Sequence, residues 1–394
     1  MNKARLVIVN SNYPNENNKY GDVFVHSRLK HYTGFFDIRV VGWKKRIEDY
    51  SFEYEGIHVD VVNTDDKLVN KLKGYTPDVI GFHFVEGWMF EKIIKPFNVP
   101  IFIWVHGGEA LGWYRRLFMF SLGNIYPFSK YVARNVIQMF QFHNFIKYAN
   151  QDVSKKVQFI FVSKWMRSIT EADTLSRIMN VEYIPNPIDP LVFKYSAKTA
   201  AHRKRILLIR SFDSKKYAND VAIDAILKLS RKDFFKELSF DIYGVGKYFG
   251  PLTNLIQNLP NVKLNNYFLE NKNIPEIHKD HGIFLCPTRQ DAQGVSMCEA
   301  MSSGLVPISS DNTAIPEFVT DQVSGFLTRS ADDIANAIEF LYLNPERFLE
   351  MSKKASEHIQ FISGTHTVVT REVNLLLKSL GREDSLEKIY RSGL

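Results

Sequence analysis

The sequence predicts an α/β protein built from two doubly wound domains, each with a parallel sheet. The chain has 394 residues, which is long for one ordinary domain and suits two domains of about 150–200 residues each. Short apolar runs alternate with longer amphipathic stretches, and this alternation is typical of parallel strands joined by helices. The alternation lapses into a polar, basic connector at residues 190–204 and then starts again.

Each half contains a series of apolar runs of strand length. The first series predicts strands at Arg5–Val9, Ile38–Val41, Val79–Phe84, Ile101–Val105 and Phe159–Val162. The second series predicts strands at Arg205–Ile209, Ser239–Tyr243, Val262–Leu264, Gly282–Cys286 and Leu305–Ser309. Ligands of such sheets bind beyond the carboxyl ends of the strands. We therefore expect the binding residues in those loops, in a cleft between the domains.

Composition excludes several classes of protein. The amino terminus runs directly into an apolar strand, without the features of a signal peptide, and no apolar stretch approaches the roughly 20 residues that span a bilayer. We therefore expect a cytoplasmic protein or one on a membrane surface. Cys286 and Cys298 lie in apolar contexts and are expected to be buried, reduced thiols. No Cys/His cluster has zinc spacing and no Asp-x-Asp occurs, so we expect no metal and no cofactor.

The net charge of +7 is unevenly distributed along the chain. Residues 113–156 contain seven Lys or Arg against one acid, Asp152, with Phe and Tyr interleaved among them. This composition suits a face that contacts anionic lipid headgroups. A pair of core helices with a solvated basic face explains it equally well. Nucleic acid is a weaker interpretation because no reader motif accompanies the charge.

The most informative segment follows the strand that ends at Cys286. Asp291 lies in a polar loop, and Glu299 lies on the second turn of a helix expected from about Val295 to a left-handed terminator at Gly304. Free backbone amides at Gln293, Gly294 and Val295 would lie between the two carboxylates. Carboxylates accept hydrogen bonds from hydroxyls, and a helix N-terminus attracts phosphate, so the segment suits a nucleotide-sugar. Alternatively, Asp291 caps the loop and Glu299 is a surface residue.

This segment resembles the signature of the retaining glycosyltransferases of family 4. That signature has two acids separated by seven residues and then Ala-Met-x-x-Gly-x-Pro-Val. Here Asp291 and Glu299 have this separation, and Ala300-Met301-Ser302-Ser303-Gly304-Leu305-Val306-Pro307-Ile308 follows. The chain departs from the family in having Asp for the first Glu and in the exchanged order of Val306 and Pro307. The resemblance implies the GT-B fold, two Rossmann-like domains facing across a cleft.

Other segments extend the resemblance over most of the chain, thinning between residues 113 and 156. Arg210 and Lys215 have the spacing of the family's Arg and Lys that neutralise the donor diphosphate, although the flanking glycines are replaced and Lys216 could serve instead. His106 resembles the family's histidine beside the reacting sugar; a lone histidine after a strand is otherwise more often structural. Expected donor-binding positions, besides Gln293, Gly294 and Val295, are Gly21, Lys216, Asn186 and Gly244. Segments 315–319 and 325–327 resemble the part that closes the family's nucleotide site.

The resemblance also implies a domain plan. We expect an acceptor-binding domain at residues 1–195, a nucleotide-sugar-binding domain at residues 196–369, and a C-terminal helix at residues 370–394 that returns to the first domain. A helix is expected near residues 384–390.

The function expected from the resemblance is retaining, metal-independent transfer of a hexosyl or N-acetylhexosaminyl group. The donor would be a UDP- or GDP-sugar and the acceptor a glycan, glycolipid or glycoprotein in bacterial surface-glycan assembly. Glu299 would hold the ribose, Asp291 the transferred sugar, and His106 the reacting ring. A nucleotide-sugar epimerase or inverting transferase of the same fold stays open, as does a non-catalytic protein that binds glycan or a membrane surface.

Overall fold

The computed structural model describes residues 3–16, 18, 21–151 and 156–382. These residues form two compact units. The first comprises residues up to Arg116, residues 122–187 and residues from Thr365 onward, and the second comprises residues 117–121 and 188–364. The boundaries between the units therefore fall near residues 187 and 364, whereas the sequence-based plan has them at 195 and 369. The helix expected near residues 384–390 lies outside the described residues.

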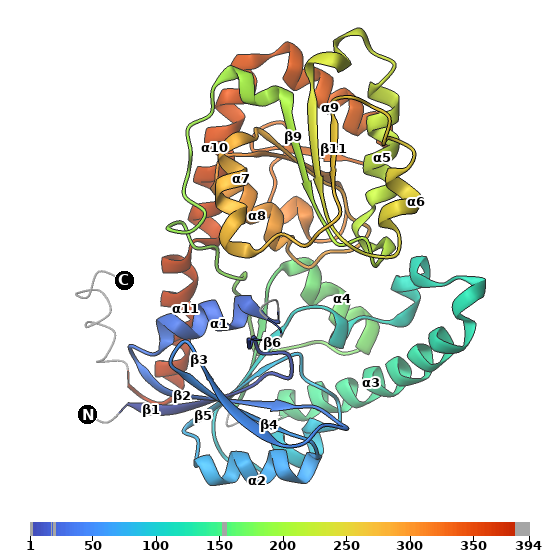
Figure 1. Cartoon of the computed structure of the whole chain (residues 1–394). Helices are drawn as coiled ribbons and strands as arrows, with labels where there is room; N and C mark the ends of the chain where they lie inside the picture. Colours follow the sequence, from blue (N-terminus) through green and yellow to red (C-terminus); the bar gives the residue numbers. More distant parts are fainter. Residues whose placement is uncertain (1–2, 17, 19–20, 152–155, 383–394) are drawn as a thin grey trace. The chain divides into compact units, whose positions relative to one another are not determined.

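The first unit contains an eight-stranded sheet in the order β3-β4-β2-β1-β5-β6-β7-β8. Its strands are β1 (Ala4–Val9), β2 (Phe36–Trp43), β3 (Tyr50–Tyr54), β4 (Ile57–Val62), β5 (Val79–His83), β6 (Ile101–Val105), β7 (Val157–Phe161) and β8 (Val181–Tyr183). Its helices are α1 (Val23–Tyr32), α2 (Asp65–Tyr75), α3 (Ile125–Gln151), α4 (Lys164–Thr174) and α11 (Thr365–Ser379). Helices α1 and α2 lie on opposite faces of the sheet (Figure 1).

The prediction of a parallel sheet is wrong at one edge of this unit. Strand β3 pairs with β4 in antiparallel register, with Tyr50 opposite Val61, while β4 is parallel to β2. The two strands form a hairpin whose turn contains Glu55 and Gly56, both with positive φ. Such a two-residue connection can join only antiparallel strands.

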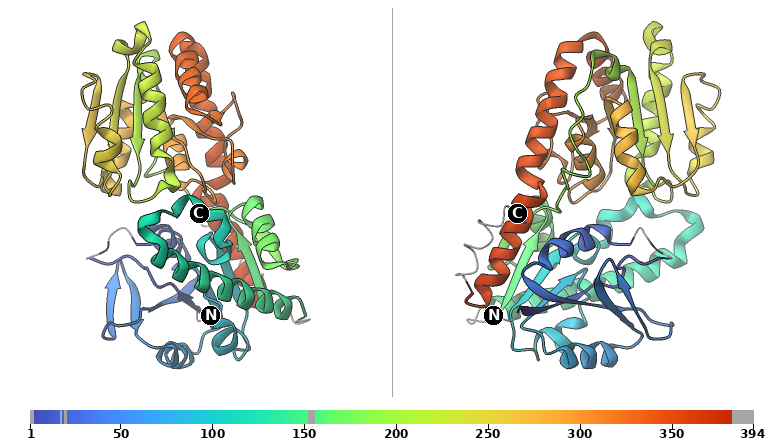
Figure 2. Two further views of the ribbon diagram at one scale, coloured as in Figure 1. Left: turned by 90° about the vertical axis from the view of Figure 1, so that its right-hand side faces the viewer. Right: turned by 60° about the vertical axis from the view of Figure 1, so that its left-hand side comes forward.

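The last helix of the described chain, α11, belongs to the first unit. Val368, Val369 and Val373 pack in one apolar cluster with α1 and with the strands of this sheet. Figure 2 shows α11 in red against the strands of the first unit. The chain therefore leaves this unit near residue 187 and returns to it at residue 365.

The second unit contains a six-stranded, fully parallel sheet in the order β11-β10-β9-β12-β13-β14. Its strands are β9 (Arg205–Ile209), β10 (Ser239–Tyr243), β11 (Val262–Asn265), β12 (Ile283–Cys286), β13 (Val306–Ser310) and β14 (Phe326–Thr328). Its helices are α5 (Asn219–Leu229), α6 (Phe249–Thr253), α7 (Ile274–Asp280), α8 (Val295–Ser302), α9 (Ala331–Leu343) and α10 (Pro345–Ser363). This order is the doubly wound one, with its topological switch point between β9 and β12.

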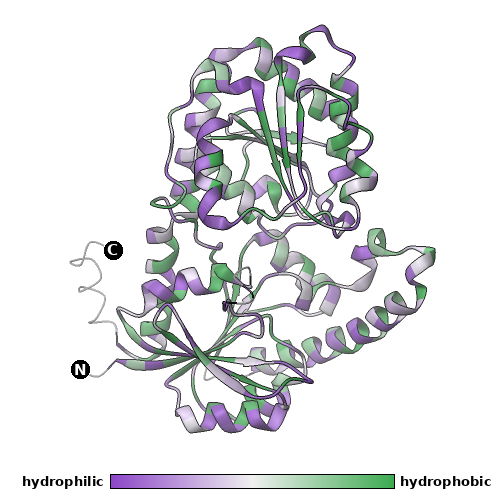
Figure 3. Ribbon diagram, in the orientation of Figure 1, coloured by the Kyte–Doolittle hydropathy of each residue, from purple (hydrophilic) through white to green (hydrophobic). Residues whose placement is uncertain are grey.

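Apolar residues concentrate on the strands of both sheets, as Figure 3 shows. In the second unit, α5 and α9 cover one face and α7, α8 and α10 cover the other (Figure 1). The α5 side is sealed by Ile223, Ile226 and Ile338, which pack with Leu208 and Ile242 of the sheet. This packing fixes the strand ends from which the candidate site is built.

Candidate donor site

Arg210 lies at the switch point of the second sheet, directly after β9. Its backbone N–H donates to the carbonyl of Tyr243, and its side chain is buried. Nη1 donates to Ser296 Oγ at 2.9 Å, and Nη2 donates to the carbonyl of Cys286 at 3.5 Å. The guanidinium is thus held between the end of β12 and the first turn of α8. Within the described part of the chain, the buried Nε of Arg210 has no hydrogen-bond partner.

Glu299 lies one turn further along α8, on the side of Ser296. Burial raises the pKa of its carboxyl to about 8, and the positive charge of Arg210 acts in the opposite direction. A carboxyl in this position can donate a hydrogen bond when protonated and accept from hydroxyls when ionised. Glu299 and Arg210 therefore form a small polar cluster at one end of the sheet.

Both side chains line a pocket of about 250 Å³ at the carboxyl ends of β9 and β10. The pocket is lined by Ile209, Arg210, Ser211, Tyr217, Tyr243, Gly244, Val245, Phe268, Leu269, Asn271, Ile274, Ser296 and Glu299. Gly244 is required by packing, because a β-carbon there would lie 2.1 Å from the carbonyl oxygen of Arg210 and 2.7 Å from the ring of Phe212. The sequence-predicted Arg210, Glu299 and Gly244 are thereby brought together.

Asp291 does not line this pocket but folds over its own loop. Its Oδ1 accepts from the backbone N–H of Gly294 at 2.9 Å and from that of Gln293 at 3.3 Å. The expectation of free amides at Gln293 and Gly294 is therefore wrong, since Asp291 occupies them. Gly294 adopts φ of +78° and leads into α8, whose first residue is Val295. Ile315 of the segment 315–319 contacts this turn, since a β-carbon on Gly294 would lie 3.0 Å from Ile315 Cδ1.

Lys215 and Lys216 form a single 3₁₀ turn with Tyr217. The ring of Tyr217 lies 5.3 Å from Arg210 Cζ and 5.2 Å from Lys216 Nζ, so it contacts both cations. The side chain of Lys215 is exposed and that of Lys216 is partly buried, and neither lysine is among the residues that line the pocket. The geometry groups Lys216 rather than Lys215 with Arg210.

His106 and its neighbours belong to the first unit. His106 Nε2 lies 2.8 Å from Nδ1 of His83, and their rings stack at 5.1 Å. Burial lowers the pKa of both histidines well below the usual value, and the charge of Arg28 acts in the same direction. Both rings are therefore neutral at pH 7, and one nitrogen of the pair carries the shared proton. Glu109 fixes the backbone here by accepting from the amides of His106 and Gly107 at 2.6 and 3.0 Å.

Two further predicted positions in the first unit have packing roles in this structure. A β-carbon on Gly21 would lie 2.2 Å from the carbonyl oxygen of Asn12, so the close approach it permits is to its own loop. Asn186 is buried and accepts from Arg28 Nη2 at 3.4 Å. Neither residue is among those that line the pocket of the second unit.

The remaining sequence-based expectations concern cysteines, metals and membrane spans. Cys286 and Cys298 are buried and unpaired, and burial raises the pKa of Cys286 to about 11. No cluster of three or more His, Cys, Asp or Glu suited to a metal ion occurs in residues 3–16, 18, 21–151 and 156–382. Over the same residues, no helix combines the length and apolar character needed to cross a bilayer.

Sequence reasoning missed several residues of the pocket. Tyr217 contacts both cations, and Ser296 holds the guanidinium of Arg210, yet neither was predicted, although Ser296 lies between the two acids of the recognised signature. The position of Ser296 in the first turn of the helix that carries Glu299 was a usable signal, since two residues three positions apart lie on one face of a helix. Nothing in the sequence marked residues 268–274, which approach the site from the β11–α7 connection.

Residues 203–344 match the family model described as glycosyl transferases group 1. The chain is 26% identical over 167 residues to the UDP-N-acetylglucosamine--peptide N-acetylglucosaminyltransferase GtfA subunit of Streptococcus agalactiae. That alignment covers 40% of this chain and 31% of the relative, so the chain spans about a third of the relative's length.

Solved glycosyltransferase structures share the fold over nearly the whole chain. Sucrose-phosphate synthase from Thermosynechococcus elongatus superposes with a TM-score of 0.73 at 13% identity, covering 95% of this chain and 99% of the other. HepE from Anabaena, solved in complex with UDP and glucose, superposes with a TM-score of 0.69 at 14% identity, covering 95% and 100%. The expected GT-B fold of two α/β domains is confirmed, with sheets that are parallel except at the β3 edge of the first unit.

Proposed function

We propose that this chain, whose residues 203–344 match the glycosyl transferases group 1 family, is a retaining glycosyltransferase of family 4. Its donor would be a nucleotide-diphosphate-sugar with UDP or GDP as carrier. The observation that carries the proposal is the pocket at the switch point of the second sheet, where Arg210 and Glu299 lie together. A doubly wound sheet binds nucleotides at that place.

Several groups in and beside the pocket have proposed roles in holding the donor. Arg210, buried and fixed by Ser296, supplies a rigid positive charge for the diphosphate. The first-turn amides of α8 from Val295 onward add the partial positive charge of a helix N-terminus. Glu299 is proposed to accept hydrogen bonds from the ribose hydroxyls. Lys216, which shares the Tyr217 ring with Arg210, is proposed as the second cation for the phosphates.

In the proposed reaction, the bond between the sugar C1 and the β-phosphate oxygen breaks. The acceptor hydroxyl forms its new bond at the same face of C1, and its proton passes to an oxygen of the departing phosphate. The barrier lies in separating a cationic sugar from an anionic diphosphate, which Arg210 and Lys216 would stabilise. This scheme requires no protein nucleophile and no metal ion. Asp291 and His106 are proposed to contact the transferred sugar.

The proposed acceptor is a glycan, glycolipid or glycoprotein in bacterial surface-glycan assembly, with the enzyme at the inner face of the cell membrane. Hexosyl or N-acetylhexosaminyl transfer is proposed. The Streptococcus agalactiae relative is named as an N-acetylglucosaminyltransferase, which supports the second.

The proposal is tested with purified full-length chain, a panel of UDP- and GDP-sugars and a panel of oligosaccharide acceptors. We expect acceptor-dependent release of nucleoside diphosphate, insensitivity to EDTA, and a product whose anomeric configuration matches that of the donor. An inverted product would favour the inverting transferase of the same fold. Interconversion of nucleotide-sugars without acceptor would favour the epimerase. Absence of nucleotide binding would exclude all three enzymes and favour a non-catalytic protein.

A further inference from the structure

Helix α3 exposes an apolar face that the fold of its own unit does not use. The helix has 27 residues, which corresponds to a length of about 40 Å. One side is buried through Asn135, Phe142, Phe145, Ile146 and Ala149. On the opposite side, Tyr126, Val136, Ile137 and Phe140 are exposed by 68%, 53%, 58% and 66%. Large apolar side chains gathered on one exposed face mark an interaction site.

The charge on this helix has a single sign. Between Ile125 and Gln151 the sequence contains no Asp or Glu, whereas Lys130, Arg134 and Lys147 are all exposed. Lys130 Nζ lies 4.4 Å from the ring centroid of Tyr126, so a cation and an aromatic ring share one spot. Outside the helix, burial raises the pKa of the partly buried Glu86, and the charge of Arg134 acts in the opposite direction. The exposed side of α3 is therefore both apolar and basic.

The neighbouring loop after α4 extends this face. His143 Nδ1 lies 2.9 Å from the carbonyl of Thr174, and Asn150 Nδ2 donates to the carbonyl of Arg177 at 2.6 Å. These contacts hold the loop against the carboxyl-terminal half of α3. The loop carries Leu175 and Met179, which are exposed by 85% and 69%. We define the α3 face as Tyr126, Lys130, Val136, Ile137, Phe140, Lys147, Leu175 and Met179.

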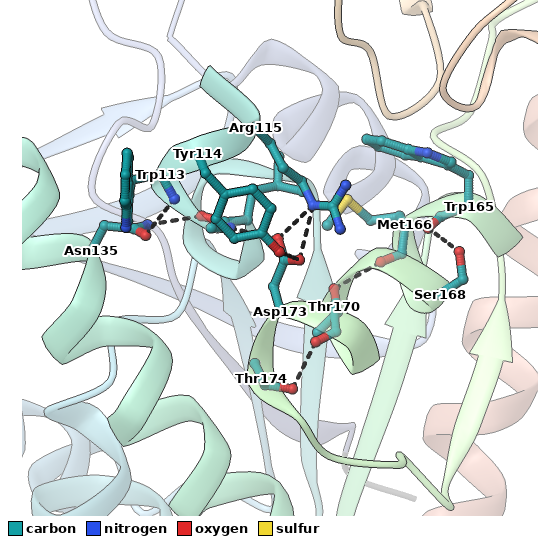
Figure 4. A network of polar contacts seen from close by, with 12 residues as sticks. Trp113, Tyr114, Arg115, Asn135, Trp165, Met166, Ser168, Thr170, Asp173 and Thr174 are labelled. Carbon is teal, nitrogen blue, oxygen red and sulfur yellow. Dashed lines mark hydrogen bonds and ion pairs between the residues drawn. The ribbon is translucent and has the colours of Figure 1, made fainter. Parts of the chain in front are cut away.

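The middle of α3 is attached to residues 111–115, which a buried carboxylate of α4 holds in place (Figure 4). Asp173 of α4 accepts from Arg115 Nε at 2.8 Å and from the backbone N–H of Gly112 at 2.6 Å. Asn135 of α3 accepts from the amide of Trp113 at 2.7 Å and donates to the carbonyl of Leu111 at 2.8 Å. The α3 face is thus presented by a helix attached to its unit at several points.

We infer that the α3 face docks on the surface of a lipid bilayer that contains anionic lipids. Tyr126 and Phe140 insert at the headgroup boundary, and Lys130 and Lys147 contact the lipid phosphates. A second copy of this chain is a poorer occupant, because the same face on both copies would bring like charges together. The inference deepens the proposed location at the inner face of the cell membrane by naming the surface that binds it, and it does not depend on the proposed transfer reaction.

Co-sedimentation with vesicles tests the inference. The full-length chain is mixed with vesicles of phosphatidylcholine alone or of phosphatidylcholine with phosphatidylglycerol. We expect binding to the mixed vesicles only, weakened by added salt. Lys130→Glu with Lys147→Glu is expected to weaken binding about ten-fold or more, since each basic residue near an anionic surface contributes appreciably. Ile137→Ser with Phe140→Ser is expected to weaken it by a similar factor.

Leu255→Ser is the matched control, because Leu255 is exposed by 59% in the second unit. It is expected to leave vesicle binding unchanged, and all variants are expected to keep the wild-type melting temperature. UDP-induced thermal stabilisation, which reports the pocket of the second unit, is expected to persist in the α3 variants. If the wild-type chain binds neither vesicle type, the inference is wrong. It is also wrong if the α3 variants bind the mixed vesicles as strongly as the wild type does. Self-association abolished by Phe140→Ser, without vesicle binding, would assign the face to a second copy instead.

Discussion

Glu299 couples the stability of the protein to pH. Its pKa is raised from 4.5 to about 8, chiefly by burial. A carboxyl whose pKa is higher in the folded than in the unfolded chain stabilises the fold fully below the unfolded pKa. That contribution is lost as the pH rises through the folded value. We therefore expect the melting temperature to fall between about pH 5 and pH 8 more steeply than in Glu299→Gln, measured by differential scanning fluorimetry.

Glu317→Gln provides the comparison for this measurement, because Glu317 lies in the same unit outside the pocket. Its pH profile should follow that of the wild type. Parallel profiles for wild type and Glu299→Gln would show that the Glu299 carboxyl is not desolvated in solution.

Gly244 permits the close approach of two strand ends that shapes the pocket. The β-carbon of Gly244→Ala would overlap the carbonyl oxygen of Arg210, and such overpacking costs about 1–3 kcal/mol. We expect a lower melting temperature and weaker UDP-induced stabilisation. Gly250→Ala is the control, because no atom lies within 4 Å of its added β-carbon. If Gly244→Ala and Gly250→Ala lower the melting temperature equally, steric overlap at Gly244 is not the cause.

Lys215 and Lys216 can be separated by substitution, since only Lys216 shares the Tyr217 ring with Arg210. If Lys216 stabilises the departing diphosphate, Lys216→Ala should lower kcat about a hundred-fold, as expected for loss of one donor to a developing oxyanion. Lys215→Ala should stay within about three-fold of wild type, because an exposed cation contributes little. Steady-state release of nucleoside diphosphate measures both variants. A larger loss of kcat in Lys215→Ala than in Lys216→Ala would assign stabilisation of the departing diphosphate to Lys215.

At the residue scale, motif spacing predicted Arg210 and Glu299, which the fold brings into one pocket. Spacing could not distinguish the two lysines, because a 3₁₀ turn changes which side chain faces a neighbour relative to an extended loop. It also could not decide between free amides at Gln293 and Gly294 and the alternative that Asp291 caps this loop, which is the arrangement in the structure. Short polar side chains form such local bonds wherever the loop permits, and the loop geometry is set by tertiary contacts.

At the scale of elements, most buried strands were predictable and most edge strands were not. The exceptions are β4, which is buried but was missed, and the edge strand β11, which was predicted. The central strands β1, β5, β6, β9 and β12 are continuous apolar runs because parallel strands are covered on both faces. Strand β3 is largely exposed and carries a polar sequence, and β8 and β14 have three residues each. Such segments form strands because a neighbouring strand supplies hydrogen-bond partners. The local pattern of apolar and polar residues does not indicate this pairing.

The end of α8 shows an element boundary that local chemistry did determine. Gly304 has φ of +88°, and its N–H donates to the carbonyl of Met301 while that of Leu305 donates to Ala300. These two bonds form a Schellman motif, which favours glycine at this position. The predicted terminator of the helix is therefore confirmed.

Helix α11 carries a buried carboxylate that adds polar contacts to its apolar packing in the first unit. Glu372 accepts from Arg28 Nε at 3.2 Å and from Trp104 Nε1 at 2.8 Å, and it also accepts from the hydroxyl of Tyr32. Glu372→Leu would leave the buried Arg28 without a counter-charge, which costs about 3–5 kcal/mol. Urea unfolding should show this loss. Arg28→Met combined with Glu372→Leu should recover part of it, because no buried charge then stays unpaired.

An exposed ion pair on the same helix serves as the control for this prediction. Arg371 Nη2 lies 3.8 Å from Glu182 Oε2, and both side chains are more than 40% exposed. Glu182→Leu should therefore change stability by less than about 1 kcal/mol. A cost for Glu372→Leu as small as this would mean that α11 is held by its apolar contacts alone.

At the scale of the whole molecule, the order of the units along the chain has a consequence for unfolding. The first unit is completed only by residues that follow the second, because α11 comes after residue 364. A chain truncated after Gly364 would lose the Glu372 carboxylate and the apolar residues Val369 and Val373, while every strand and helix of the second unit is retained. Units of this kind unfold as separate cooperative blocks when their stabilities differ.

We therefore expect the truncated chain to show one calorimetric transition shifted to lower temperature and one near its wild-type position. Only the second should rise on addition of UDP, because the proposed donor pocket belongs to the second unit. A chain truncated after Arg382 keeps α11 and should behave as the full chain does. If truncation after Gly364 lowers both transitions equally, α11 stabilises the two units together and the division into independent blocks fails.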